Sequence, residues 1–96
     1  MRRALAAAIA TASIAAAVVA SAEPPAGAAA CSGCHPASTR VTSPVPRLIG
    51  LDRAAIVRAM QDFRSGQRAA TVMDRIAKGF TDEEIQAIAA WFATQK

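Results

Sequence analysis

The sequence predicts a small all-α protein, and three observations point to that class. The chain has 96 residues, which suffice for one small domain. Two segments carry apolar residues at helical spacing between capping signals, and no segment shows the pattern of a convincing β-strand. Alanine accounts for 26 of the residues, so the apolar core is thin. A chain this short normally needs an additional staple, such as a disulfide or a bound group.

Residues 1–22 have the pattern of a cleavable export signal and are set aside from the fold. Arg2 and Arg3 precede an uncharged, alanine-rich stretch, and the small residues of 20–22 end it before Glu23. The stretch is short and weakly apolar for a membrane span, which favours cleavage over an uncleaved anchor. We therefore expect a signal peptide over 1–22 and a mature domain over 23–96, with membrane attachment only if the signal stays uncleaved.

Asp52 and Gly66 predict the two ends of a middle helix. Asp52 is a good N-cap, and Gly66 is a typical C-terminal stop. Between them, apolar residues recur at helical spacing, and Met60 is one of these. Met60 is therefore expected in the core.

A second capping pattern predicts the start of the final helix. Thr81 and Glu84 have the spacing of a capping box, while Phe80 and Ile85 have that of a hydrophobic staple. The helix that follows carries one apolar stripe, made of Ile85, Ile88, Ala89 and Phe92.

Residues 31–35, whose sequence is CSGCH, supply a site for such an additional stabilising group. Cys31 and Cys34 share one face of a helical turn and His35 follows directly, which is the arrangement that attaches c-type haem. A disulfide between the two cysteines would close a tiny loop and add little stability. A redox dithiol would need a preceding strand, and a zinc site would need a carboxylate as fourth ligand. The motif therefore predicts one covalently bound haem c, with His35 as an axial ligand of its iron.

A second axial ligand would have to be a methionine, because the chain has a single histidine. Met60 has the pattern of a core residue, whereas Met73 lies far enough after His35 for the chain to wrap around a porphyrin. Met73 is the predicted distal ligand, although it also fits one helical face with Ile76 and Phe80 as ordinary core. Ligation by imidazole and thioether favours electron transfer over small-molecule chemistry.

The chain from residue 23 onward resembles a single-haem class I c-type cytochrome. It matches that family in order at the attachment site, residues 46–50 (PRLIG), residues 63–68 (FRSGQR), Met73 and the final helix. Within the family, residues 73–85 look most like the haem subunit of flavocytochrome c sulfide dehydrogenases. The resemblance implies a class I cytochrome c fold, with three to four short helices around one covalently bound haem. It also implies an electron carrier, and not an enzyme, that works in the periplasm.

The resemblance implies further details. In the family, a proline carbonyl in the loop after the attachment site accepts a hydrogen bond from the proximal histidine, and Pro46 matches that position, with Pro44 a near alternative. The first helix would be shortened to about residues 26–34. Because that helix lacks aromatics, Trp91 or Phe92 would lie against alanine where the first and last helices cross.

Positive charge concentrates in the middle of the chain. From Arg40 to Lys78, eight basic residues stand against three acidic ones, and we expect these cations to steer docking to an acidic redox partner. Arg64 and Arg68 are the candidates for contacts with the haem propionates. Residues 23–96 carry nine basic and seven acidic residues without interleaved aromatics, which does not support nucleic-acid binding.

These observations predict a periplasmic electron-transfer cytochrome whose haem c is ligated by histidine and methionine. Two roles remain open from the sequence. As a subunit, the protein would accept electrons from a flavoprotein that oxidises sulfide; as a free shuttle, it would serve another periplasmic dehydrogenase. The alternative from a different class is a haem enzyme or sensor with an open distal site.

Overall fold

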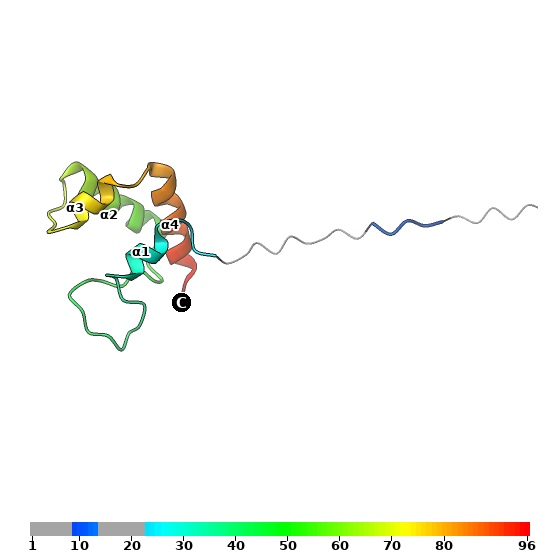
Figure 1. The fold of residues 1–96 in the computed structure, drawn as a ribbon, viewed down its shortest axis with the longest axis horizontal. Coiled ribbons are helices and arrows are strands. Elements are labelled where there is room, and N and C mark those ends of the chain that lie inside the picture. The colour runs from blue at the N-terminus through cyan, green and yellow to red at the C-terminus, as the bar shows by residue number, and fades with distance from the viewer. Residues whose placement is uncertain (1–8, 14–22) are drawn as a thin grey trace, which may run out of the picture.

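The computed structural model of the protein describes residues 9–13 and 23–96 (Figure 1). The predicted signal peptide falls on residues 1–22, so all of it except 9–13 lies outside the described residues. The regular structure of the described part is entirely helical, which confirms the all-α fold class. Its four helices are α1 (Ala28–Ser32), α2 (Arg53–Ser65), α3 (Met73–Lys78) and α4 (Asp82–Thr94). Within the described residues, no helix combines the length and the apolar character needed to cross a membrane.

The two ends of α2 lie where the sequence predicts them. The Asp52 carboxylate accepts a hydrogen bond of 3.3 Å from the backbone N–H of Ala55, so Asp52 is the N-cap. Gly66 ends the helix in the left-handed conformation, at φ 81°, a region that glycine enters without steric penalty.

The capping box at the start of α4 is present in both directions. The Thr81 hydroxyl accepts from the backbone N–H of Glu84 at 3.1 Å, and the Glu84 carboxylate accepts from the backbone N–H of Thr81 at 2.9 Å. The predicted apolar stripe is the buried face of this helix and consists of Ile85, Ile88, Ala89 and Phe92.

Helix α1 is shorter than the expected 26–34. Gly27 precedes it at φ 89°, a left-handed conformation that cannot continue an α-helix. After Ser32 the chain tightens into a turn in which the backbone N–H of Cys34 donates to the carbonyl of Cys31 at 3.1 Å. Ala28, on α1, is fully buried and belongs to the same core cluster as Phe92.

The helices are arranged around α2, which packs against both α3 and α4. Figure 1 shows α1 beside α4, with the connection from α1 to α2 looping away from the helices. This loop covers residues 33–52 and has no regular structure. It begins at the cysteine motif and ends at the N-cap of α2, so the motif stands at the edge of the helical core.

Candidate functional site

A cavity of about 730 Å³ lies between the helices and the long loop. Its size falls within the range of about 300–1,000 Å³ that is usual for ligand pockets. Most of the described side chains around it are apolar, and they include Leu48, Ile56, Met60, Phe63, Ile76 and Ile88. A large apolar cavity in a domain with so thin a core is the expected setting for a flat apolar cofactor.

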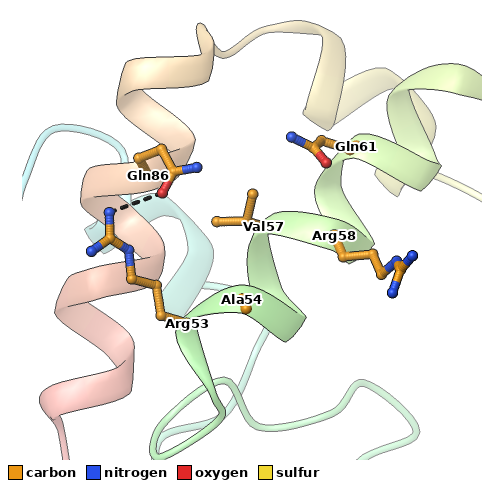
Figure 2. Close-up of a pocket in the computed structure, with 6 residues that line it drawn as sticks. All are labelled: Arg53, Ala54, Val57, Arg58, Gln61 and Gln86. Atoms are coloured by element: carbon orange, nitrogen blue, oxygen red, sulfur yellow. Dashed lines mark hydrogen bonds between the residues drawn. The ribbon is translucent and has the colours of Figure 1, made fainter.

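A second hollow, of about 430 Å³, lies on the outside between α2 and α4 (Figure 2). Its lining is more polar and contains none of the predicted ligands; it consists of Arg53, Ala54, Val57, Arg58, Gln61 and Gln86. We therefore place the functional site at the larger cavity, where the motif residues gather.

The three residues of the attachment motif all line the larger cavity. Cys31 is half-buried on α1, and Cys34 is exposed just beyond the helix. The backbone N–H of His35 donates to the carbonyl of Cys31 at 2.9 Å, so the turn holds the histidine beside the first cysteine.

Burial raises the pKa of the Cys31 thiol; the nearby Cys34 adds to this shift, and a hydrogen bond from the backbone opposes it. A redox dithiol needs the reverse, a cysteine whose pKa is lowered so that thiolate is present at neutral pH. The environment of Cys31 thus argues against a catalytic dithiol.

His35 is oriented by the loop that follows it. Its Nδ1 lies 2.5 Å from the carbonyl oxygen of Pro46. Because a carbonyl can only accept, Nδ1 carries the proton and donates it to this bond. In the neutral ring the other nitrogen, Nε2, then carries no proton and is available to a metal.

Met73 is the first residue of α3, and its half-buried side chain lines the same cavity as His35. Met60 lines this cavity too, from α2, so its assignment to the ordinary core was incomplete. Helical spacing identifies an apolar face, but it does not say whether that face meets another helix or a cavity wall. Met60 is the residue that sequence reasoning missed at the site.

The two predicted arginines lie in different surroundings. Arg68 lines the cavity, and its guanidinium carbon lies 4.9 Å from the centroid of the Phe63 ring. Arg64 is not among the described residues that line the cavity; its guanidinium donates to the Asp82 carboxylate and to the Phe80 carbonyl. Contact with a propionate stays a prediction for both, and the geometry favours Arg68.

A few buried polar atoms of the described residues have no hydrogen-bond partner. Among the described residues, Arg47 Nε, Asp74 Oδ1 and Trp91 Nε1 are buried without a hydrogen bond. Arg47 directly follows Pro46, and Asp74 directly follows Met73. Arg47, Asp74 and Trp91 are not among the described residues that line the cavity. The fit to haem c comes instead from two thiols, an imidazole and a thioether on one apolar cavity.

Comparison with known proteins identifies the family. No family model matches the chain. Over 62 residues it is 44% identical to the cytochrome subunit of sulfide dehydrogenase from Chlorobaculum tepidum, covering 65% of this chain and 56% of that protein. Over 70 residues it is 31% identical to cytochrome c-554(548) from Halomonas halodenitrificans, covering 69% of this chain and 84% of the relative. The chain belongs to the class I c-type cytochromes.

This cytochrome also matches the thiosulfate dehydrogenase electron acceptor of Stutzerimonas stutzeri, at 40% identity over 63 residues, which cover 64% of the chain and 29% of the relative. The chain thus spans about half of the sulfide dehydrogenase subunit and under a third of the electron acceptor. The resemblance to the haem subunit of sulfide dehydrogenases is confirmed. Family membership also confirms the cofactor, a covalently bound haem c with its iron.

Proposed function

We propose that this cytochrome is an exported electron carrier whose haem c is bound through Cys31 and Cys34, with His35 and Met73 as the axial ligands. The observation that carries the proposal is that all four side chains line one apolar cavity. Haem c supplies one-electron exchange at its iron when it is bound. The signal peptide over 1–22, the mature domain over 23–96 and the periplasmic location are parts of the same proposal.

The protein's own residues hold and tune this site. The bond from His35 Nδ1 to Pro46 fixes the ring tautomer and raises the basicity of the ligating nitrogen. The apolar lining excludes water, and a thioether ligand raises the reduction potential. Arg68 is the proposed propionate contact, since it brings a positive charge to the cavity wall.

A carrier role is favoured over a haem enzyme or sensor with an open distal site. An enzyme or sensor needs a vacant or exchangeable position at the metal. The half-buried Met73 thioether lines the same cavity as His35, which supports a closed iron that exchanges electrons without binding substrate. The chemistry of bond making and breaking then belongs to a partner protein.

The names of two relatives suggest what that partner does. One is the cytochrome subunit of a sulfide dehydrogenase, and the other is the electron acceptor of a thiosulfate dehydrogenase. We propose that the donor is a dehydrogenase of reduced sulfur compounds, with the flavoprotein subunit of a sulfide dehydrogenase as the first candidate. A free shuttle that serves another periplasmic dehydrogenase is the second.

Charge on α3 supports docking beside the haem edge. Met73 and Ile76 of this helix line the cavity, while Arg75 and Lys78 are exposed in its last turn. These cations therefore stand close to the cavity wall, where they would attract an acidic surface on the partner.

The proposal is tested by producing the full chain in a host that matures c-type cytochromes. We expect a coloured exported protein, a mass that equals residues 23–96 plus one haem, and a single one-electron wave in a redox titration. A colourless product with both thiols free would overturn the proposal. Co-purification from the native host distinguishes the two partner roles, because a subunit would carry a flavin-containing chain with it and a shuttle would not.

A further inference from the structure

Arg64 joins the end of α2 to the start of α4. Its Nη1 donates to Oδ1 of Asp82 at 2.5 Å, and its Nη2 donates to the carbonyl oxygen of Phe80 at 2.8 Å. We call this pair of contacts the Arg64 bridge. The Arg64 side chain is 31% exposed and that of Asp82 is 72% exposed, so the ion pair is a surface contact of modest strength, whereas the bond to the Phe80 carbonyl is partly buried.

The bridge closes a loop that contains Met73. Residues 66–79, here called the Met73 segment, leave the end of α2, form the short α3 and return to the start of α4. The Arg64 bridge ties the two ends of this segment together across 16 to 18 positions of sequence. Because α3 has only six residues, its own hydrogen bonds do little to hold it in place.

The Met73 segment is also attached to α2, through the packing of α3 and through two contacts of Arg68. The backbone N–H of Arg68 donates to the Asp62 carbonyl at 3.1 Å, and the Arg68 guanidinium lies over the Phe63 ring. These contacts hold the beginning of the segment. The Arg64 bridge holds its far end at Phe80, whose ring lines the cavity and packs on the core.

We propose that Arg64 is a positioning residue that keeps the Met73 segment closed, so that the Met73 thioether stays on the haem iron. Arg64 acts through its two partners in the structure, the Phe80 carbonyl and the Asp82 carboxylate. The inference rests on the proposed function, in which Met73 is the distal ligand.

The proposal predicts an effect on ligand exchange. An added ligand such as imidazole reaches the ferric iron only when the Met73 segment is open, so its apparent Kd is the intrinsic Kd divided by the open fraction. Loss of both contacts in Arg64→Gln should raise the open fraction roughly tenfold and lower the apparent Kd by the same factor. Asp82→Asn, which spares the contact with Phe80, should lower the apparent Kd for imidazole roughly threefold.

Two matched controls separate this role from general stability. Arg53 also links α2 to α4, through a bond of 2.9 Å from its Nη2 to Gln86 Oε1, but it does so at the other end of α2 (Figure 2). Arg53→Gln therefore removes an α2–α4 contact without touching the Met73 segment. Glu83→Gln removes a negative charge from the same first turn of α4 as Asp82. Both controls should change the apparent Kd by less than about twofold, because surface substitutions of this kind have small effects.

The experiment titrates imidazole into the ferric holoproteins and records thermal unfolding of each in parallel. Tighter imidazole binding in Arg64→Gln and Asp82→Asn, at unchanged affinity in the two controls, supports the proposal. It is overturned if Arg64→Gln binds imidazole no more tightly than Arg53→Gln. If Arg64→Gln does not fold, the comparison of Asp82→Asn with Glu83→Gln decides in the same way.

A Met73→Ala holoprotein distinguishes failure of the inference from failure of the proposed function. If its ferric spectrum and imidazole affinity equal those of the wild type, Met73 is not a ligand and both proposals fall. If Met73→Ala binds imidazole far more tightly while Arg64→Gln does not, the ligand assignment stands and only the role of Arg64 is refuted.

Discussion

Gly27 lies directly against the ring of Phe80. A Cβ atom on Gly27 would come within 2.5 Å of Phe80 Cε1 and within 3.2 Å of Ile88 Cδ1. Gly27 also has φ 89°, a conformation that side chains with a Cβ rarely adopt. The start of α1 therefore meets Phe80 and α4 at a point where only glycine fits.

The first prediction concerns this contact. Gly27→Ala should destabilise the holoprotein by about 3 kcal/mol, because it combines left-handed strain with overpacking against Phe80. Gly66→Ala is the matched control, since Gly66 has φ 81° but no atom lies within 4 Å of the place that an added methyl group would take; it should cost only about 1 kcal/mol. Denaturant unfolding of both variants measures the difference, and equal losses would contradict the steric account.

The second prediction compares the two methionines of the cavity. Met73→Ala should open the iron to added ligands and lower the reduction potential, because the thioether is lost. Met60→Ala removes a methionine from the same cavity wall and should leave both properties close to wild type, with a loss of stability of about 2 kcal/mol or more. Ferric absorption spectra and redox titration provide the measurement. An unchanged spectrum in Met73→Ala would refute the ligand assignment.

The third prediction concerns attachment. Cys31→Ala and Cys34→Ala should each leave one thioether bond, so haem stays with the chain after denaturation in acid. The double variant should release it, because no covalent link remains. Mass spectrometry of the denatured chains distinguishes these cases, and a haem-sized mass gain on the double variant would show that another residue forms the bond.

The fourth prediction concerns the capping box of α4. Thr81→Ala should lower the free energy of unfolding by about 1 kcal/mol, because the backbone N–H of Glu84 loses its hydrogen-bond partner. Thr94→Ala is the matched control at the other end of the helix, where the hydroxyl donates to the Trp91 carbonyl; this exposed site should change stability by no more than about 0.5 kcal/mol. Thermal unfolding of the two holoproteins tests the comparison, and an equal effect of both substitutions would argue against the cap.

The fifth prediction tests the role of charge on α3. Oxidation of the ferrous protein by ferricyanide, an anion, should slow as ionic strength rises, because salt screens the attraction. Replacing Arg75 and Lys78 together by glutamine should lower the rate at low salt and flatten this dependence. Arg58→Gln removes a cation from the outer hollow of α2 and should do neither. A salt response that is flat in the wild type would exclude electrostatic steering at this edge.

Local sequence signals predicted both ends of α2 and the start of α4 correctly. Asp52, Gly66, Thr81 and Glu84 act through hydrogen bonds or backbone conformations that span at most four positions. The buried stripe of α4 was predictable for the same reason, since helical spacing relates residues within one or two turns. The limits of α1 could not be predicted in this way. Gly27 adopts its left-handed conformation where the chain meets Phe80, which is far away in sequence.

The sequence alone therefore determined the helical class, both ends of α2, the start of α4 and the CSGCH attachment motif, because each depends on neighbours along the chain. Only the tertiary structure decided that His35 bonds to the carbonyl of Pro46 rather than that of Pro44, that Met60 shares the cavity wall with Met73, and that Arg64 pairs with Asp82. These contacts join residues 11 or more positions apart, so they follow from how the loop and helices cross in space, which no local pattern specifies.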